Sequence, residues 1–202
     1  MLSFAAAVFF LIATPGPGVL STAGVGSAFG ARAGMRYLLG LFIGHYAVAL
    51  AVISGLAALV LADPAIRTVL FVASTAYLLY LALKIALAGS TVAIVAARRA
   101  PGIGGGLILQ ALNPKAYAVN TALFSGFAFM PDRPGVEIAV KLAIVAAIWV
   151  PLHLAWLWAG IALHRLDLSA RTQRIVNLAM AGSMLAVVGL AVIAQLRVPD
   201  GG

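Results

Sequence analysis

This 202-residue sequence contains few charged residues and no cysteine. Only 9% of its residues are charged, against about 25% in a soluble globular domain, whereas 64% are hydrophobic and the mean hydropathy is +1.12. A water-soluble fold could not cover so much apolar surface, so the composition predicts a protein that lies in the lipid bilayer. The absence of cysteine excludes disulfides, thiolate catalysis and Cys-ligated metals.

Acidic residues are also scarce, and none lies in the middle of an apolar stretch. The five acids are Asp63, Asp132, Glu137, Asp167 and Asp200. The sequence therefore offers no intramembrane carboxylate pair for acid–base chemistry, no metal cluster and no acidic proton relay, so we expect neither an enzyme nor a cofactor. The net charge of +8 is scattered between apolar runs, which argues against nucleic acid as a partner.

Six apolar stretches are long enough to cross the roughly 30 Å core of a bilayer as helices. No Lys or Arg precedes the first stretch and no clear cleavage site follows it, so we expect a retained span and not a signal peptide. We predict an all-α, polytopic membrane protein that forms a single domain over residues 1–202. The stretches are 2–26, 37–62, 66–88, 105–130, 140–163 and 175–197.

The distribution of Lys and Arg predicts how the chain is oriented. The loops after the first, third and fifth stretches carry Arg32, Arg36, Lys84, Arg98, Arg99, Arg165, Arg171 and Arg174, and the opposite side carries Arg67, Arg133, Lys141 and Arg197. The richer side should face the cytoplasm, which places both termini outside. Two three-helix halves, residues 1–97 and 98–202, would then have opposite orientations, as in an inverted-topology repeat.

The first stretch contains a helix-breaking run, Thr14-Pro15-Gly16-Pro17-Gly18. Its two prolines lack the amide donors that a continuous helix needs. We expect Thr14 to act as an N-cap, with Pro15 at the first position of a new half-helix. The free amides and the positive dipole end of that half-helix would lie inside the membrane.

The fourth stretch has a similar break at Asn113-Pro114-Lys115. Asn113 is a favourable N-cap, Pro114 suits the first helical position, and Lys115 adds a full positive charge. Pro114 lies near mid-depth, where broken backbone is tolerated only inside protein or beside a cavity. Paired breaks at corresponding positions of two halves indicate a transporter binding site, although packing kinks are the simpler alternative.

Other polar residues lie within the apolar stretches. We expect Gln110 and Asn120 to join the two breaks in binding substrate. His45 and His153 are candidates for ion coupling or for lining the pathway, with hydrogen bonding between helices as the alternative.

Four motifs carry a family resemblance. They are Thr14 to Gly18, the Gly40 and Gly44 pair, Ala76-Tyr77-Leu78-Leu79-Tyr80-Leu81, and Gln110-Ala111-Leu112-Asn113-Pro114-Lys115-Ala116. Together they resemble the LysE/RhtB family of amino-acid exporters over essentially the whole chain. The resemblance implies a bacterial cytoplasmic-membrane protein that exports amino acids or close derivatives, is driven by the membrane gradient and has no bound cofactor.

The lack of intramembrane acids also predicts the charge of the substrate. Lys115 and the half-helix dipoles match a carboxylate, whereas a cationic side chain would stay unpaired, so neutral or homoserine-like amino acids are expected. The expected partners are therefore this small molecule and the lipid bilayer, and the glycine-rich helix faces would also permit a homo-oligomer. A non-transporting membrane scaffold and a small-solute channel are the alternatives.

Overall fold

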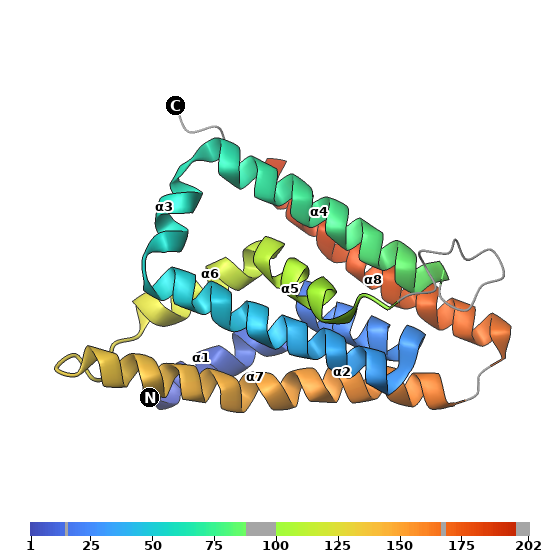
Figure 1. Cartoon of the computed structure of the whole chain (residues 1–202), viewed down its shortest axis with the longest axis horizontal. Helices are drawn as coiled ribbons and strands as arrows, with labels where there is room; N and C mark the ends of the chain where they lie inside the picture. Colours follow the sequence, from blue (N-terminus) through green and yellow to red (C-terminus); the bar gives the residue numbers. More distant parts are fainter. Residues whose placement is uncertain (15, 88–99, 167–168, 197–202) are drawn as a thin grey trace.

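The computed structural model describes residues 1–14, 16–87, 100–166 and 169–196. Every regular element in these residues is an α-helix (Figure 1). The eight helices are α1 (Leu2–Ala13), α2 (Pro17–Ile53), α3 (Leu56–Ala62), α4 (Pro64–Leu87), α5 (Gly102–Leu112), α6 (Pro114–Gly126), α7 (Pro134–Arg165) and α8 (Ala170–Leu196).

Helix α2 consists of two arms that fold back on each other at Gly30 (Figure 1). Gly30 has φ 76° and ψ −173°, a conformation that is essentially open only to glycine. The first predicted stretch therefore corresponds to α1 with the first arm of α2, and the second to the other arm with α3. The reversal between them falls between residues 26 and 37, as the sequence predicts.

The helix lengths confirm a polytopic membrane protein. Three described helices are long and apolar enough to cross a bilayer, namely Pro17–Ile53, Pro64–Leu87 and Pro134–Leu163, and two shorter apolar helices, Leu2–Ala13 and Gly102–Leu112, precede the predicted breaks. The broken first and fourth spans are thus present. Helix α7, in contrast, continues through Pro151, which has no capping residue before it.

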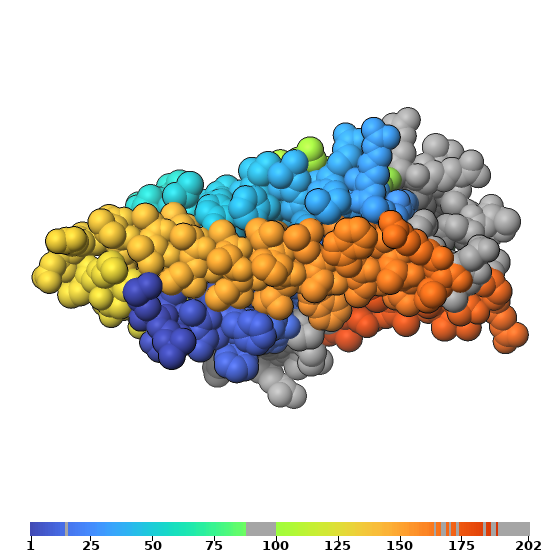
Figure 2. Space-filling view, turned by 90° about the horizontal axis from the view of Figure 1, so that it is seen from below, coloured from blue at the N-terminus to red at the C-terminus, as the bar shows by residue number. Residues whose placement is uncertain are grey.

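Glycines allow α2 to lie very close to its neighbours. A Cβ added at Gly40 would overlap the carbonyl of Ile103, and one at Gly106 would overlap the carbonyl of Tyr37, so α2 and α5 meet backbone to backbone. Gly160 of α7 meets the carbonyl of Ala23 in the same way. In Figure 2, α7 runs along one face of the molecule with α1 on one side of it and α2 on the other.

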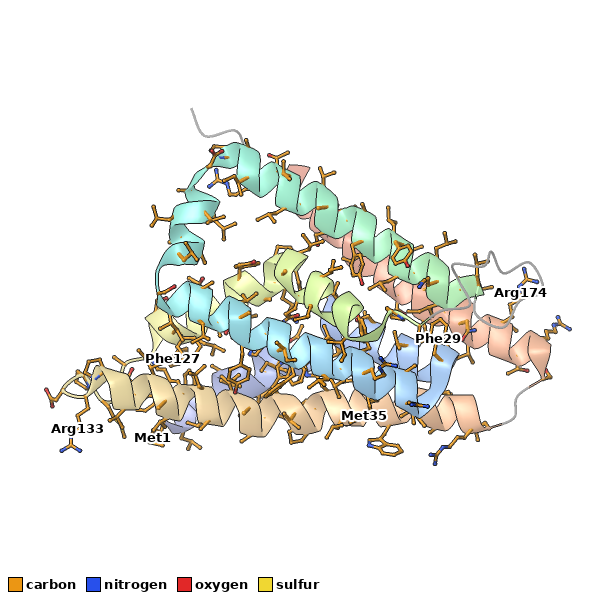
Figure 3. The ribbon with its side chains drawn as sticks, in the orientation of Figure 1. Met1, Phe29, Met35, Phe127, Arg133 and Arg174 are labelled. Carbon is orange, nitrogen blue, oxygen red and sulfur yellow. The ribbon has the colours of Figure 1, made fainter. Side chains whose placement is uncertain are left out.

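The helix ends alternate between the two ends of the molecule. Phe29 and Arg174 lie toward one end, and Met1, Phe127 and Arg133 lie toward the other (Figure 3). The turns after the first and fifth predicted stretches therefore lie at the same end of the molecule. The orientation expected from the charge count requires this, because it places both turns on the same side of the membrane.

Lys141, which the charge count includes near the start of the fifth stretch, lies within α7. Its side chain is buried within α7 and forms a 2.7 Å salt bridge with Glu137 one turn earlier. Glu137 also accepts hydrogen bonds from the backbone amides of Phe129, at 2.9 Å, and Met130. Glu137 thus links the connection between α6 and α7 to the first turn of α7. The opposite charges of Glu137 and Lys141 balance each other.

Candidate functional site

The two helix breaks are in direct contact. The ammonium of Lys115 donates a 2.7 Å hydrogen bond to the carbonyl of Thr14, which lies 101 positions earlier in the chain. The same side chain lies along Gly16, where an added Cβ would come within 3.0 Å of the Lys115 Cδ. A side chain on residue 16 would therefore require the Lys115 side chain to shift by a few tenths of an ångström.

At the first break, Gly16 and not Thr14 is the N-cap of the new helix. Gly16 is extended, Pro17 occupies the first helical position, and the carbonyl of Gly16 accepts the first helical bond from Leu20. Thr14 instead ends α1, and its hydroxyl donates a 2.7 Å bond back to Phe10. The prediction of a Thr14 cap was wrong because the run contains two prolines, and the chain starts its helix at the second.

At the second break, the predicted cap is confirmed. The side chain of Asn113 accepts a 3.1 Å hydrogen bond from the backbone amide of Lys115, and Pro114 takes the first position of α6. The amides at the start of α2 and α6 have no acceptor within their own helix, so both ends carry partial positive charge.

A cavity of about 60 Å³, room for a few water molecules, lies where the breaks meet. The predicted site residues that line it are Thr14, Gly16, Gly18, His45, Gln110, Asn113, Lys115, Asn120 and His153. It is completed by Leu11, Ile12, Val19, Ala116, Val119 and Trp149. Pro17 and Pro114 start the two helices without lining the cavity, and Pro15 lies outside the described residues.

Three stacked rings form one wall of the cavity. Trp149 stacks with both histidines, and its ring centroid lies 3.6 Å from that of His153 and 5.8 Å from that of His45. Gln110 Nε2 lies 3.3 Å from His45 Nδ1, and His153 Nδ1 lies 2.9 Å from the carbonyl of Trp149. Each imidazole is thus held by stacking and by one hydrogen bond.

A family model for the LysE type translocator matches residues 9–196, a range that includes both breaks and every residue lining the cavity. This chain belongs to the LysE type translocator family. The predicted resemblance is therefore confirmed, and the translocator is a membrane protein that moves small solutes. Searches of curated proteins and of solved structures gave no match.

Among the residues that the structure describes, Lys115 is the one charged side chain that lines the cavity of this translocator. The structure describes three acids. Asp63 caps α4 through a 2.7 Å bond from the amide of Ala65, Glu137 pairs with Lys141, and Asp132 lies in the turn before α7, so none of the three lines the cavity. Within the described residues there is also no group of His, Asp or Glu that could hold a metal ion. The cavity therefore suits a ligand that carries an anionic group.

Trp149 is a cavity residue that sequence reasoning missed. Trp149 and His153 are four positions apart on α7, a spacing that places both on one helix face. That spacing alone could not distinguish packing between helices from a cavity wall. What distinguishes them is His45 on α2, which the fold brings against the same indole ring.

Proposed function

We propose that this translocator exports amino acids across the bacterial cytoplasmic membrane, with small neutral or homoserine-like substrates preferred. The observation that carries the proposal is the cavity at the junction of the two breaks, where two helix N-termini and Lys115 converge. Discontinuous helices of this kind are how many transporters hold a substrate carboxylate within the membrane.

The electrostatics of the cavity favour a substrate without net charge. A carboxylate is attracted by Lys115 and by the positive ends of α2 and α6. A lysine or arginine side chain would add a second cation near Lys115, in a medium where an unpaired charge costs several kcal/mol. Since no carboxylate lines the described cavity, nothing there offsets that cost.

The contact between Lys115 and Thr14 suggests how binding is linked to movement. It joins the two predicted halves, residues 1–97 and 98–202, through a neutral carbonyl. A substrate carboxylate is a stronger acceptor for an ammonium than a carbonyl is. In the proposed mechanism, the substrate carboxylate competes with the Thr14 carbonyl for Lys115 and so weakens the contact between the halves. The halves can then move relative to each other in gradient-coupled alternating access.

Flux measurements in proteoliposomes test the proposal. Vesicles loaded with a labelled neutral amino acid, or with labelled lysine, are compared for efflux with and without an imposed proton or sodium gradient. We expect gradient-dependent efflux of a small neutral amino acid and little efflux of lysine. Efflux of lysine or arginine faster than of any neutral amino acid tested would overturn the charge argument.

A further inference from the structure

Two buried polar atoms on the cavity wall have no hydrogen-bond partner among the residues that the structure describes. They are Nε2 of His45, whose residue is 4% exposed, and Oδ1 of Asn120, whose residue is fully buried. Both residues line the cavity. Buried polar atoms are nearly always paired, and an unpaired one is costly, so these two atoms point to a ligand that pairs them.

The bonds that the two side chains do make fix the polarity of the free atoms. Asn120 uses Nδ2 to donate a 2.8 Å bond to the carbonyl of Ala116, which leaves the acceptor Oδ1 of this cavity-lining residue without a partner among the described residues. Gln110 Nε2 is an amide donor, so His45 Nδ1 must accept from it and the neutral ring carries its proton on Nε2. The wall therefore presents one free acceptor and one free donor.

We propose that His45 and Asn120 form an uncharged clamp for a zwitterion. Asn120 Oδ1 accepts a hydrogen bond from the substrate ammonium, and His45 Nε2–H donates to the carboxylate that Lys115 also attracts. This inference rests on the proposed export of amino acids and assigns a role to each of the two side chains in that site.

The clamp explains how a cavity without a carboxylate can accept an ammonium group. Lys115 balances the substrate carboxylate, so the ammonium needs hydrogen-bond acceptors more than a counter-charge. An N-acetyl derivative has lost the charged donors, and an α-hydroxy acid offers a single hydroxyl in their place. Both analogues should therefore compete poorly with the parent amino acid.

The variants Asn120→Leu and Asn120→Ala together distinguish an effect on substrate binding from an effect on folding. Leu keeps the branching and the heavy-atom count of Asn, whereas Ala leaves extra space, so a defect shared by both reflects the lost acceptor and not a blocked cavity. Removing a buried unpaired oxygen should leave the substrate-free protein as stable as before or more stable. Ser125→Ala is the matched control, because this exposed hydroxyl lies on the same helix and donates to Thr121 outside the cavity.

The 202-residue chain is reconstituted in proteoliposomes, and uptake of a labelled neutral amino acid is measured by counterflow. The competitors are the same amino acid without label, its N-acetyl derivative and its α-hydroxy analogue. We expect both Asn120 variants to raise KM roughly 10- to 100-fold and to lose the discrimination against the α-hydroxy acid, with an unchanged or higher Tm. His45→Phe keeps the ring stacked on Trp149 and should raise KM similarly.

The outcomes separate this inference from the proposed function. If the wild type transports no amino acid, both the proposed function and the clamp are overturned. If the wild type transports and the Asn120 variants keep its KM and its discrimination, the clamp alone is overturned. A loss of transport that accompanies a lower Tm in both variants would assign Asn120 to packing and would overturn the clamp as well.

Discussion

Lys141 and Lys115 differ in whether a carboxylate balances the positive charge of the side chain. Lys141 is buried against Glu137 at 2.7 Å, and its ammonium also lies 5.7 Å from the centre of the Phe4 ring. Lys115 is partly exposed to the cavity and donates to a neutral carbonyl. Of the two, Lys115 has charge available for a substrate, whereas the charge of Lys141 is already matched.

Lys115→Met should therefore abolish transport with little effect on folding. Removing the cation takes away the main attraction for the carboxylate, and we expect flux to fall about 100-fold or more, in line with about 3 kcal/mol for a charge-assisted hydrogen bond. Efflux from proteoliposomes and protection of cells against an excess of a small neutral amino acid would measure it. Wild-type efflux in Lys115→Met would contradict a binding role.

Lys141→Met is the matched comparison. It leaves Glu137 without its ion-pair partner, so we expect lower stability, seen as less folded protein in the membrane. The two methionine variants should thus fail for opposite reasons, one in transport and one in folding. Equal folded amounts of both would show that the Glu137 pair does not stabilise the fold.

At the scale of the helices, the breaks depend on a proline together with the residue before it. Asn113 caps the helix that Pro114 begins, and Gly16 adopts the extended conformation before Pro17. Val150 offers no such cap, and α7 runs through Pro151. A proline by itself therefore does not interrupt a helix in this protein.

Pro114→Ala should reduce flux more than it reduces the amount of folded protein. The restored amide lets α5 and α6 close toward one helix, which removes the helix N-terminus that Asn113 caps beside the cavity. Pro151→Ala, in continuous α7, is the control and should keep wild-type flux. Both variants are assayed by transport per unit of folded protein. If Pro114→Ala transports as Pro151→Ala does, the break is only a packing kink.

The glycine run before the second break gives a prediction about packing. A Cβ at Gly106 would overlap backbone atoms of α2, whereas one at Gly104 meets nothing within 4 Å. Gly106→Ala should therefore force α5 away from α2 and lower the amount of folded protein, with a cost of about 1–3 kcal/mol. Gly104→Ala should fold as the wild type does. Size-exclusion profiles and thermal unfolding in detergent would compare them.

What could be predicted from sequence was mostly local. The cap at Asn113 depends on three adjacent residues, and the reversal at Gly30 falls in a short connection between two apolar runs. The start of α2 was misassigned because two prolines two positions apart offered equivalent starts. Tertiary contacts were beyond local reasoning. The ion pair that buries Lys141 and the ring of Trp149 beside His45 both depend on how the helices pack.

At the scale of the whole molecule, the site lies where the two halves of the sequence meet. Its wall draws on α1, α2, α5, α6 and α7, and the hydrogen bond from Lys115 to Thr14 crosses between the halves. This direct contact holds the two halves together at the site. Transport by alternating access would require the contact to break and re-form once in each cycle.

The orientation of the molecule is a prediction that this cysteine-free chain allows to be tested directly. The connections expected in the cytoplasm contain Arg32, Arg98 and Arg171, and the excess of Lys and Arg on that side should hold it inside. Arg174 and Arg133 lie toward opposite ends of the structure (Figure 3). Single-cysteine variants at these two positions therefore report on opposite membrane faces.

We expect a membrane-impermeant maleimide to label Arg133→Cys in sealed cells, and to label Arg174→Cys and Arg98→Cys only after the cells are permeabilised. The reason is that translocating the arginine-rich connections would oppose the membrane potential, at about 2.3 kcal/mol per charge for each 100 mV. Each variant should first be shown to transport as the cysteine-free wild type does. Efficient labelling of Arg98→Cys from outside, with Arg133→Cys protected, would reverse the orientation and place both termini in the cytoplasm.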